Sequence, residues 1–308
     1  MKVLVTGGCG FIGSHVVEEL LSNGNKVSIV GKTCNLGNIK SFLDKVSFYK
    51  GDVRNAKFIS NLVKRNDTVV HMAAQVNVDL SIQNPWIFWD VNVFGTFNIL
   101  EAIRKYNKKL VFMSTCEVYG EVSNGKADET HPTNPKSPYA VSKLCADRYC
   151  YTYYLTYGLP ITIIRSFNVY GPRQSYGVGG AVIPKFIKTV MSDKSPTIFG
   201  DGSQIRDYVY VKDVAHGIAT AASQDFQGEI INLATGRGTK IKDVAYQIVK
   251  ESGKEDSLEP QFVKGRPGEL MRSIGNASKA KKLLDWKPKV NFKKGLKNTF
   301  DSFKNYID

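Results

Sequence analysis

The segment between Ser114 and Lys143 carries a hydroxyl, a thiol, a carboxylate, a phenol and an amine, at spacings that indicate one chemical site. Tyr139 and Lys143 lie one helical turn apart, so on a helix they share a face and the ammonium lies beneath the phenol. A nearby cation favours the phenolate, which turns an inert phenol into a base near neutral pH. The pair alone also fits an ordinary surface helix, so its meaning depends on the elements around it.

Short apolar runs alternate with helical patterns through the first half of the chain. The runs are apolar throughout rather than at alternate positions, which is typical of a parallel sheet with helices on both faces. We therefore expect an α/β fold with a Rossmann-type doubly wound parallel sheet. The predicted strands are residues 2–6, 27–30, 46–49, 68–71, 109–114 and 160–165. The predicted helices include 14–21, 56–64, 85–105 and 137–157.

A glycine-rich loop follows the first predicted strand and opens the first predicted helix. Gly7, Gly10 and Gly13 form a G-x-x-G-x-x-G pattern there. Glycine permits the tight turn and lets the backbone approach a pyrophosphate, while the helix N-terminus attracts the anion. A lone glycine triplet is a weak signal, but one placed between a strand and a helix predicts dinucleotide binding.

The second predicted strand ends without the acidic residue that usually accepts a hydrogen bond from the adenosine ribose. Gly31 and Lys32 follow this strand instead. A 2′-phosphate would be tolerated there or paired with the lysine, which makes NADP possible beside NAD. In the alternative interpretation Lys32 points into water and NAD binds through other contacts. Asp52, after the third strand, is suited to the adenine edge.

The formal net charge of +14 raises the question of a nucleic-acid partner. Lysines and arginines are spread along the chain without a basic block or an aromatic-basic pattern. A solvated basic surface is therefore favoured over nucleic-acid binding. A local excess of positive charge at an anionic substrate site is compatible with both interpretations.

Cysteine usage and hydropathy are typical of a reducing, aqueous compartment. The cysteines are odd in number and lack CxxC spacing, so neither a disulfide framework nor a zinc site is indicated. They are Cys9, Cys34, Cys116, Cys145 and Cys150. The first residues do not resemble a signal peptide, and no apolar run approaches the roughly 20 residues that span a bilayer. We expect a cytoplasmic protein with no bound metal and no membrane association.

The strand-helix rhythm changes after Arg165. A Gly- and Pro-rich loop covers residues 168–180, a helix is expected at 181–191, and a turn at 200–202. Two further helices, 277–284 and 293–306, close the chain. These features predict a smaller, C-terminal mixed α/β part that covers a substrate.

Further motifs make the chain resemble a known family almost from end to end. They are His71-Met72-Ala73-Ala74-Gln75, Asn92 within Val91-Asn92-Val93-Phe94-Gly95-Thr96, Ser137-Pro138-Tyr139, Asn168-Val169-Tyr170-Gly171-Pro172-Arg173, Gly200-Asp201-Gly202-Ser203-Gln204-Ile205-Arg206-Asp207 and Arg266-Pro267-Gly268-Glu269. With the glycine loop and the Tyr-Lys pair, the chain resembles the extended short-chain dehydrogenase/reductases of the NAD-dependent epimerase/dehydratase family, which act on nucleotide sugars. The motifs are specific for the family but not for one substrate.

The resemblance implies a division of the chain and a set of cofactor contacts. Residues 1–166 with 209–235 would form the dinucleotide-binding domain, and residues 167–208 with 236–308 the nucleotide-sugar-binding domain. The expected cofactor-binding residues are Gly7, Gly10, Phe11, Ile12, Gly13, Lys32, Asp52, Val53, Ala73, Ala74, Asn92, Tyr139 and Lys143.

The resemblance also implies a shared first step of catalysis. Tyr139 would take the proton from the C4 hydroxyl of the sugar while the nicotinamide takes the C4 hydride. Thr115 would hold that hydroxyl, and Lys143 would bind the nicotinamide ribose and stabilise the tyrosinate. The substrate's diphosphate would be bound by Asn168, Arg206 and Arg266, since guanidinium groups suit phosphate oxygens.

Glu117 is the residue that distinguishes the branches of this family. In the dehydratases a glutamate at this position removes the C5 proton of the 4-ketone, water leaves from C6, and the hydride returns to C6. In the 4-epimerases the position is usually small or hydroxylic, and the ketone rotates before the hydride returns to C4. Glu117 therefore favours a nucleotide-sugar 4,6-dehydratase over a UDP-glucose/galactose-type 4-epimerase. It does not exclude a UDP-glucuronate decarboxylase.

Cys116 departs from the dehydratase pattern, which has Asp or Ser there. A thiol is a poor acid for a leaving water, so Glu117 would have to act as both base and acid, and Cys116 also fits a small buried filler residue. The segments 168–186 and 200–213 resemble the shorter epimerases at least as well. A non-catalytic dinucleotide sensor is a further hypothesis, which the intact Thr115, Tyr139 and Lys143 disfavour.

Members of the family often pair through two helices that form a four-helix bundle. The corresponding segments here are residues 85–105 and 137–157. A homodimer is therefore expected by resemblance alone.

Overall fold

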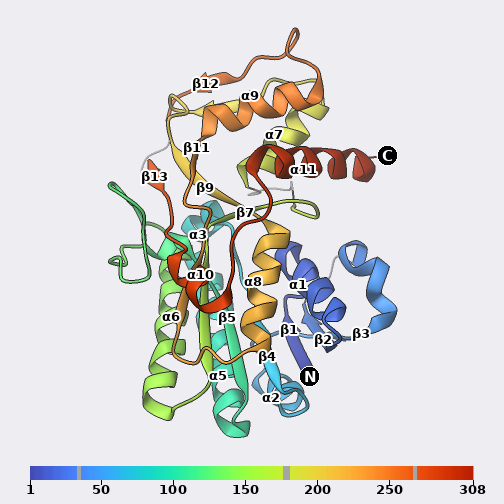
Figure 1. The fold of residues 1–308 in the computed structure, drawn as a ribbon, viewed down its shortest axis with the longest axis vertical. Coiled ribbons are helices and arrows are strands. Elements are labelled where there is room, and N and C mark those ends of the chain that lie inside the picture. Colours follow the sequence, from blue (N-terminus) through green and yellow to red (C-terminus); the bar gives the residue numbers. More distant parts are fainter. Residues whose placement is uncertain (33–35, 176–180, 266–268, 308) are drawn as a thin grey trace.

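The computed structural model of the protein describes residues 1–32, 36–175, 181–265 and 269–307. Its large sheet has seven strands, all parallel, in the order β10-β6-β5-β4-β1-β2-β3 (Figure 1). The strands are β1 (Lys2–Thr6), β2 (Lys26–Gly31), β3 (Val46–Lys50), β4 (Thr68–His71), β5 (Lys109–Thr115), β6 (Ile161–Ser166) and β10 (Ile230–Leu233). This order confirms the predicted doubly wound α/β fold, because the chain runs outward from β1 in both directions.

Helices cover both faces of this sheet, as its apolar strands require. They are α1 (Phe11–Ser22), α2 (Ala56–Lys64), α5 (Gly95–Tyr106), α6 (Pro138–Tyr157), α8 (Val211–Ser223) and α10 (Ser278–Leu284). Two short helices, α3 (Val78–Gln83) and α4 (Pro85–Phe88), pack against α6. Two 3₁₀ segments, η1 (Leu36–Lys45) and η3 (Cys116–Val118), and one π-helical segment, η2 (Trp89–Phe94), join them. Helix α6 begins where the Ser137 hydroxyl accepts a hydrogen bond from the Ala140 amide, and it ends at Gly158 in a left-handed conformation.

A smaller mixed part lies above the large sheet in the view of Figure 1. Its strands form two sheets, in which β7 and β13 pair with β9 in parallel, β11 pairs with β9 in antiparallel orientation, and β12 pairs with β8. The strands are β7 (Asn168–Tyr170), β8 (Thr197–Phe199), β9 (Ile205–Tyr210), β11 (Gly238–Lys240), β12 (Gln261–Val263) and β13 (Arg272–Ser273). The helices are α7 (Val182–Met191), α9 (Ile241–Ser252) and α11 (Phe292–Ile307).

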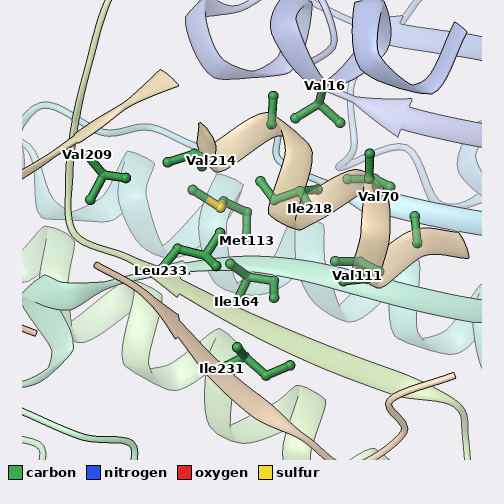
Figure 2. Close-up of a cluster of buried hydrophobic side chains, with 14 of the residues drawn as sticks. Val16, Val70, Val111, Met113, Ile164, Val209, Val214, Ile218, Ile231 and Leu233 are labelled. Carbon is green, nitrogen blue, oxygen red and sulfur yellow. The ribbon is translucent and has the colours of Figure 1, made fainter. Parts of the chain in front are cut away.

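Three apolar cores hold these layers together. One lies on the sheet face covered by α1 and α8, a second on the opposite face under α2, α5 and α6, and a third within the smaller part. Figure 2 shows the first core, where Val214 and Ile218 of α8 lie between Val16 of α1 and strands that carry Val111 and Ile164. Both faces of the sheet are therefore buried.

The structure corrects the prediction of one long helix over residues 85–105. The segment is helical, but η2 separates α4 from α5 with a π-helical turn. π-helical turns occur frequently at functional sites. Here the turn contains Asn92, whose carbonyl accepts a hydrogen bond from the Thr96 hydroxyl at 2.6 Å.

The cysteine spacing did not indicate a disulfide framework, yet one described cysteine is paired. Cys9 is disulfide-bonded, whereas Cys116, Cys145 and Cys150 are free thiols. Pairing depends on the distance between two cysteines in the folded chain, and irregular sequence spacing does not report that distance.

The first core generates a test of the fold. Ile218 is fully buried between α1 and the sheet. We expect Ile218→Ala to lower the free energy of unfolding by about 2–5 kcal/mol, because it removes buried methyl groups and leaves a cavity. Urea denaturation measures this loss. The control is Tyr246→Ala on the exposed surface of α9, which is expected to change stability by about 0.5 kcal/mol or less. Equal losses in both variants would contradict the assigned core.

Candidate active site

The carboxyl ends of β1, β4 and β5 open into a cavity of about 1240 Å³. Parallel strands in an open α/β sheet place their ligands at this edge. The cavity runs from the glycine loop, past the ends of β4 and β5, to residues of the smaller part. Its lining includes the predicted site residues Gly7, Gly10, Phe11, Ile12, Gly13, Lys32, Asp52, Val53, Ala73, Ala74, Thr115, Glu117, Tyr139, Lys143, Asn168 and Arg206.

The glycine loop has the geometry that a dinucleotide's pyrophosphate requires. Gly7 has a φ of +73°, and a Cβ at Gly13 would lie 2.2 Å from the Gly7 carbonyl oxygen, so neither position accepts another residue without a shift. The Gly10 amide donates to the same carbonyl at 2.9 Å, and α1 begins at the next residue. The amides of the first helical turn therefore face the cavity. The residues present fit a nicotinamide dinucleotide.

Asp52 lines the cavity and belongs to an ion-pair cluster. Arg54 donates to it through Nε at 3.0 Å and Nη2 at 2.6 Å, and Lys32 Nζ lies 3.4 Å from Asp52 Oδ2. These bonds, with Arg54 first, hold the pKa of Asp52 well below its ordinary value. Arg54 also pairs with Asp90. The Lys32 side chain is 64% exposed, so it both contacts water and pairs with Asp52.

A buried polar chain ties β1 to the neighbouring strand and helix. Thr6 Oγ1 accepts a hydrogen bond from the Ala73 amide at 3.1 Å and lies 2.6 Å from His71 Nδ1. The other ring nitrogen of His71 lies 3.0 Å from Thr96 Oγ1. Burial lowers the pKa of His71 to about 3, so its ring is neutral near pH 7. Each nitrogen has a hydroxyl partner, which indicates a structural histidine.

Asn92 lies behind the cavity wall rather than on it. Its side-chain carbonyl accepts from the Gln75 amide at 2.7 Å, and its amide group donates to the Gln75 carbonyl at 3.0 Å and to Ser142 Oγ at 2.9 Å. Ser142 in turn donates to the Tyr139 carbonyl at 2.7 Å. Asn92 therefore fixes the cavity-lining segment that follows β4 against α6. The sequence analysis assigned no role to Gln75 or Ser142, because their contacts arise only in the folded chain.

Tyr139 and Lys143 lie side by side on the buried face of α6, but their electrostatics differ from the sequence expectation. Burial raises the pKa of Tyr139, and its hydrogen bond with Thr115 acts in the opposite direction. Lys143 Nζ donates to the Met113 carbonyl at 2.6 Å and lies 4.3 Å from the centre of the Phe112 ring. The predicted lowering of the phenol pKa by Lys143 is not found, because the ammonium is directed at β5.

The turn after β5 places a thiol and a carboxyl at the cavity. Thr115 Oγ1 accepts a hydrogen bond from the Glu117 amide at 3.3 Å, which fixes η3. Burial raises the pKa of Glu117, and Arg206 opposes this shift. Burial also raises the pKa of Cys116, which is hydrogen-bonded to Ser273. The Glu117 carboxylate is therefore a stronger base than an exposed one, whereas the thiol stays protonated.

The opposite wall comes from the smaller part. Asn168 Nδ2 donates to the Asp207 carbonyl at 3.3 Å, and Arg206 Nη1 donates to its neighbour's carbonyl, that of Ile205, at 3.1 Å. Tyr208, which the sequence did not single out, lines the cavity with a buried hydroxyl that has no hydrogen-bond partner among the described residues. Arg266 lies outside the described residues.

Within the described ranges, no cluster of His, Cys, Asp and Glu side chains could hold a metal ion. In the same ranges, no helix is long and apolar enough to cross a membrane.

Comparison with known proteins places this geometry in a family. The family described as GDP-mannose 4,6 dehydratase matches residues 4–299. A putative UDP-glucose 4-epimerase of Methanocaldococcus jannaschii is 40% identical over 98% of both chains. The UDP-glucose 4-epimerase of Thermotoga maritima, solved with UDP-glucose, is 35% identical over 100% of both chains, with a TM-score of 0.94.

A dehydratase also matches nearly the whole chain. The dTDP-glucose 4,6-dehydratase of Bacillus anthracis, solved in complex with NAD, is 33% identical over 99% of this chain and 97% of that one, with a TM-score of 0.88. Both reaction types thus occur among proteins that match the whole chain. The chain belongs to the extended short-chain dehydrogenase/reductase family of NAD-dependent epimerases and dehydratases that act on nucleotide sugars.

Proposed function

We propose that the protein is a nucleotide-sugar 4,6-dehydratase. The observation that carries this proposal is the position of Glu117, a half-buried carboxyl that lines the cavity close to Tyr139. An epimerase needs no group that exchanges a proton at C5. A carboxyl whose pKa is raised by burial suits that task, because its carboxylate is a stronger base than an exposed one.

The first step oxidises C4 of the sugar. When bound, a nicotinamide would supply the hydride acceptor for this step. Tyr139 takes the C4 hydroxyl proton while Thr115, to which it is hydrogen-bonded, orients that hydroxyl. Lys143, on the same face of α6, is proposed to bind the cofactor ribose. If its ammonium leaves the Met113 carbonyl and turns toward Tyr139, its charge also favours the tyrosinate.

The second step eliminates water across C5 and C6. Glu117 takes the C5 proton, the electron pair forms the C5–C6 double bond, and the C6–O bond breaks as Glu117 returns its proton to the leaving hydroxyl. Glu117 must act as both base and acid, because burial keeps the thiol of Cys116 a weak acid. Return of the C4 hydride to C6, with uptake at C5 of one proton that balances the proton Tyr139 took from the C4 hydroxyl, would leave a 4-keto-6-deoxy sugar.

The substrate's diphosphate is proposed to lie against Asn168 and Arg206 in the smaller part, with Arg266 as the third contact. We propose NAD as the cofactor, in keeping with the neighbour solved with NAD. The carboxylate of Asp52 supports this choice, because it lies beside Lys32 and would repel a 2′-phosphate at that end of the cavity.

Cys116 supports a second candidate, a nucleotide-sugar 4-epimerase. Epimerisation needs Tyr139, Thr115 and room for the 4-ketone to turn, but no acid for a leaving group. The relative at 40% identity is named as a putative enzyme of this kind. A conversion assay separates the candidates. A product that has lost the mass of water indicates dehydration, and a new isomer of unchanged mass indicates epimerisation. Loss of carbon dioxide from a uronic acid nucleotide indicates decarboxylation. If no nucleotide sugar is converted, the protein is a sensor.

We also propose that the protein forms a homodimer through the outer faces of α4, η2, α5 and α6. Large apolar side chains are exposed there, and contiguous patches of this kind mark interfaces. Trp86 is 68% exposed and stacks on Trp89, with ring centres 5.2 Å apart. The exposed set is Trp86, Trp89, Phe94, Phe97, Val141, Tyr149, Leu155 and Tyr157.

Tyr139→Phe tests the first step. Loss of the phenolic hydroxyl is expected to lower turnover by about 10²-fold or more, because no base remains for the C4 hydroxyl. Turnover and cofactor reduction are measured with each candidate nucleotide sugar. The control is Tyr151→Phe on the same helix, which does not line the cavity and is expected to keep wild-type turnover. Normal turnover of Tyr139→Phe would refute the scheme.

Glu117→Gln tests the choice of branch. The amide cannot take the C5 proton, so water loss is expected to fall by about 10²-fold or more, while C4 oxidation persists. Mass spectrometry of the products measures water loss, and nicotinamide absorbance measures C4 oxidation. Binding of NAD should be unchanged. Undiminished dehydration in this variant would show that Glu117 has no role in the elimination.

The dimer proposal is tested with Trp86→Lys. A charge in the apolar interface is expected to shift the protein from dimer to monomer in sedimentation or light-scattering measurements. The matched control is Tyr246→Lys on α9, outside the exposed set, which should leave the dimer intact. A wild-type protein that is monomeric at micromolar concentration would overturn the proposal.

A further inference from the structure

The β7 loop (residues 171–175) contacts α1, the helix that begins at the glycine loop. Arg173 Nη2 lies 3.0 Å from a carboxylate oxygen of Glu18, and Nη1 lies 3.4 Å from Ser14 Oγ. His15 Nε2 lies 3.0 Å from the carbonyl oxygen of Pro172. Two adjacent loop residues are therefore held by one turn of α1. These contacts join the part of the molecule that carries the large sheet to the smaller part, which carries β7.

Arg173 has a backbone conformation that residues with a side chain rarely adopt. Its φ is +68°. Among the described residues, the other non-glycine positions with positive φ are Asn107, Asp193 and Asp285, short polar residues at or just after the end of a helix. Arg173 lies at no helix end and has no short polar group to form the local hydrogen bonds that favour this conformation. Other contacts must offset the strain, and strained residues of this kind cluster at functional sites.

The elements on both sides of these contacts reach the cavity. On the α1 side, Phe11 lines the cavity, and its ring meets the ring of buried His15 edge-on, with centres 6.2 Å apart. On the loop side, Gln174 lines the cavity and donates through Nε2 to the Val169 carbonyl at 3.1 Å. The side-chain oxygen of Gln174 is buried and has no hydrogen-bond partner in the part of the chain that the structure describes. Such an acceptor suits a ligand that brings a donor.

We propose that Arg173 is a positioning residue that couples the cofactor half of the cavity to the substrate half. Through its contacts with α1 it holds the β7 loop in place, so that a dinucleotide bound at the glycine loop orders this loop for the nucleotide sugar. Arg173 does not line the cavity and acts through its neighbour Gln174. The first ligand orders the loop, so the second ligand binds with a smaller loss of conformational entropy. This coupling is reciprocal.

The test compares the affinity for NADH, measured by its fluorescence, with and without saturating UDP or dTDP. In the wild-type protein one of the two diphosphates is expected to lower the Kd of NADH by about five-fold or more. In Arg173→Gln the factor should fall below about two-fold, while the affinity for NADH alone is unchanged. A merely structural role would instead weaken NADH binding with and without the diphosphate. The Glu18 side chain is 46% exposed, so this variant leaves no buried charge without a partner.

A second variant separates the side-chain contacts from the backbone strain. Arg173→Gly removes the contacts and also relieves the strain, because glycine adopts positive φ readily. It should lose the coupling as Arg173→Gln does. Hydrogen–deuterium exchange then reads the loop directly. NADH alone should slow exchange of the β7 loop amides in the wild-type protein and not in Arg173→Gln.

The matched control is Arg272→Gln. Arg272 of β13 also joins the two parts, since Nη1 donates to the Val122 carbonyl at 2.9 Å and to the Gly125 carbonyl at 2.6 Å, but it does not line the cavity. It should lower stability and keep both the coupling and the slowed exchange. The proposal is overturned if neither diphosphate changes the NADH affinity of the wild-type protein, if folded Arg173→Gln keeps the coupling, or if the control loses it equally. The inference rests on the proposed function only for the two ligands of the cavity, and no measurement needs turnover, so failure of the dehydratase assignment is seen separately.

Discussion

The packing of α6 against β5 and β6 is the constraint on which the active site depends. The hydrogen bond from Lys143 to the Met113 carbonyl joins the helix that carries Tyr139 to the strand that ends in Thr115. Arg165 joins the same helix to β6 one turn further on. Because these contacts are buried, they are little weakened by water, and a base and a hydroxyl from distant parts of the sequence stay within hydrogen-bonding distance.

Burial disfavours the charged form of each titrating group around Tyr139. It raises the pKa of Tyr139 and Glu117 and lowers the pKa of Lys143, so each group shifts toward its neutral form. The groups around Tyr139 therefore carry less charge than the same groups would in water. The anionic diphosphate and the cationic nicotinamide then change the local potential most strongly, and proton transfer can be coupled to their binding.

The sequence predicted those parts of the fold that depend on local pattern. Apolar strands and the glycine loop located the sheet and the cofactor end, because their signals are local in the chain. The break at η2, the clamp of Asn92 on Gln75 and the pairing of Asp147 with Arg165 could not be predicted, since each depends on which elements are neighbours in space. The disulfide of Cys9 was missed for the same reason. The motifs therefore located residues that line the cavity, but they did not reveal the buried groups that hold those residues in place.

The choice between dehydration and epimerisation depends on two adjacent residues with different environments. Cys116 is hydrogen-bonded to Ser273, and burial raises its pKa. Its thiol is therefore too weak an acid to protonate a leaving hydroxyl. Glu117 lines the cavity. Burial raises its pKa, and the charge of Arg206 opposes this rise. If Arg206 binds the diphosphate, its charge is neutralised and the pKa of Glu117 rises further. A higher pKa would make the Glu117 carboxylate a stronger base for the C5 proton, and in the proposed reaction the carboxylic acid formed by that transfer would then be the acid for the leaving hydroxyl.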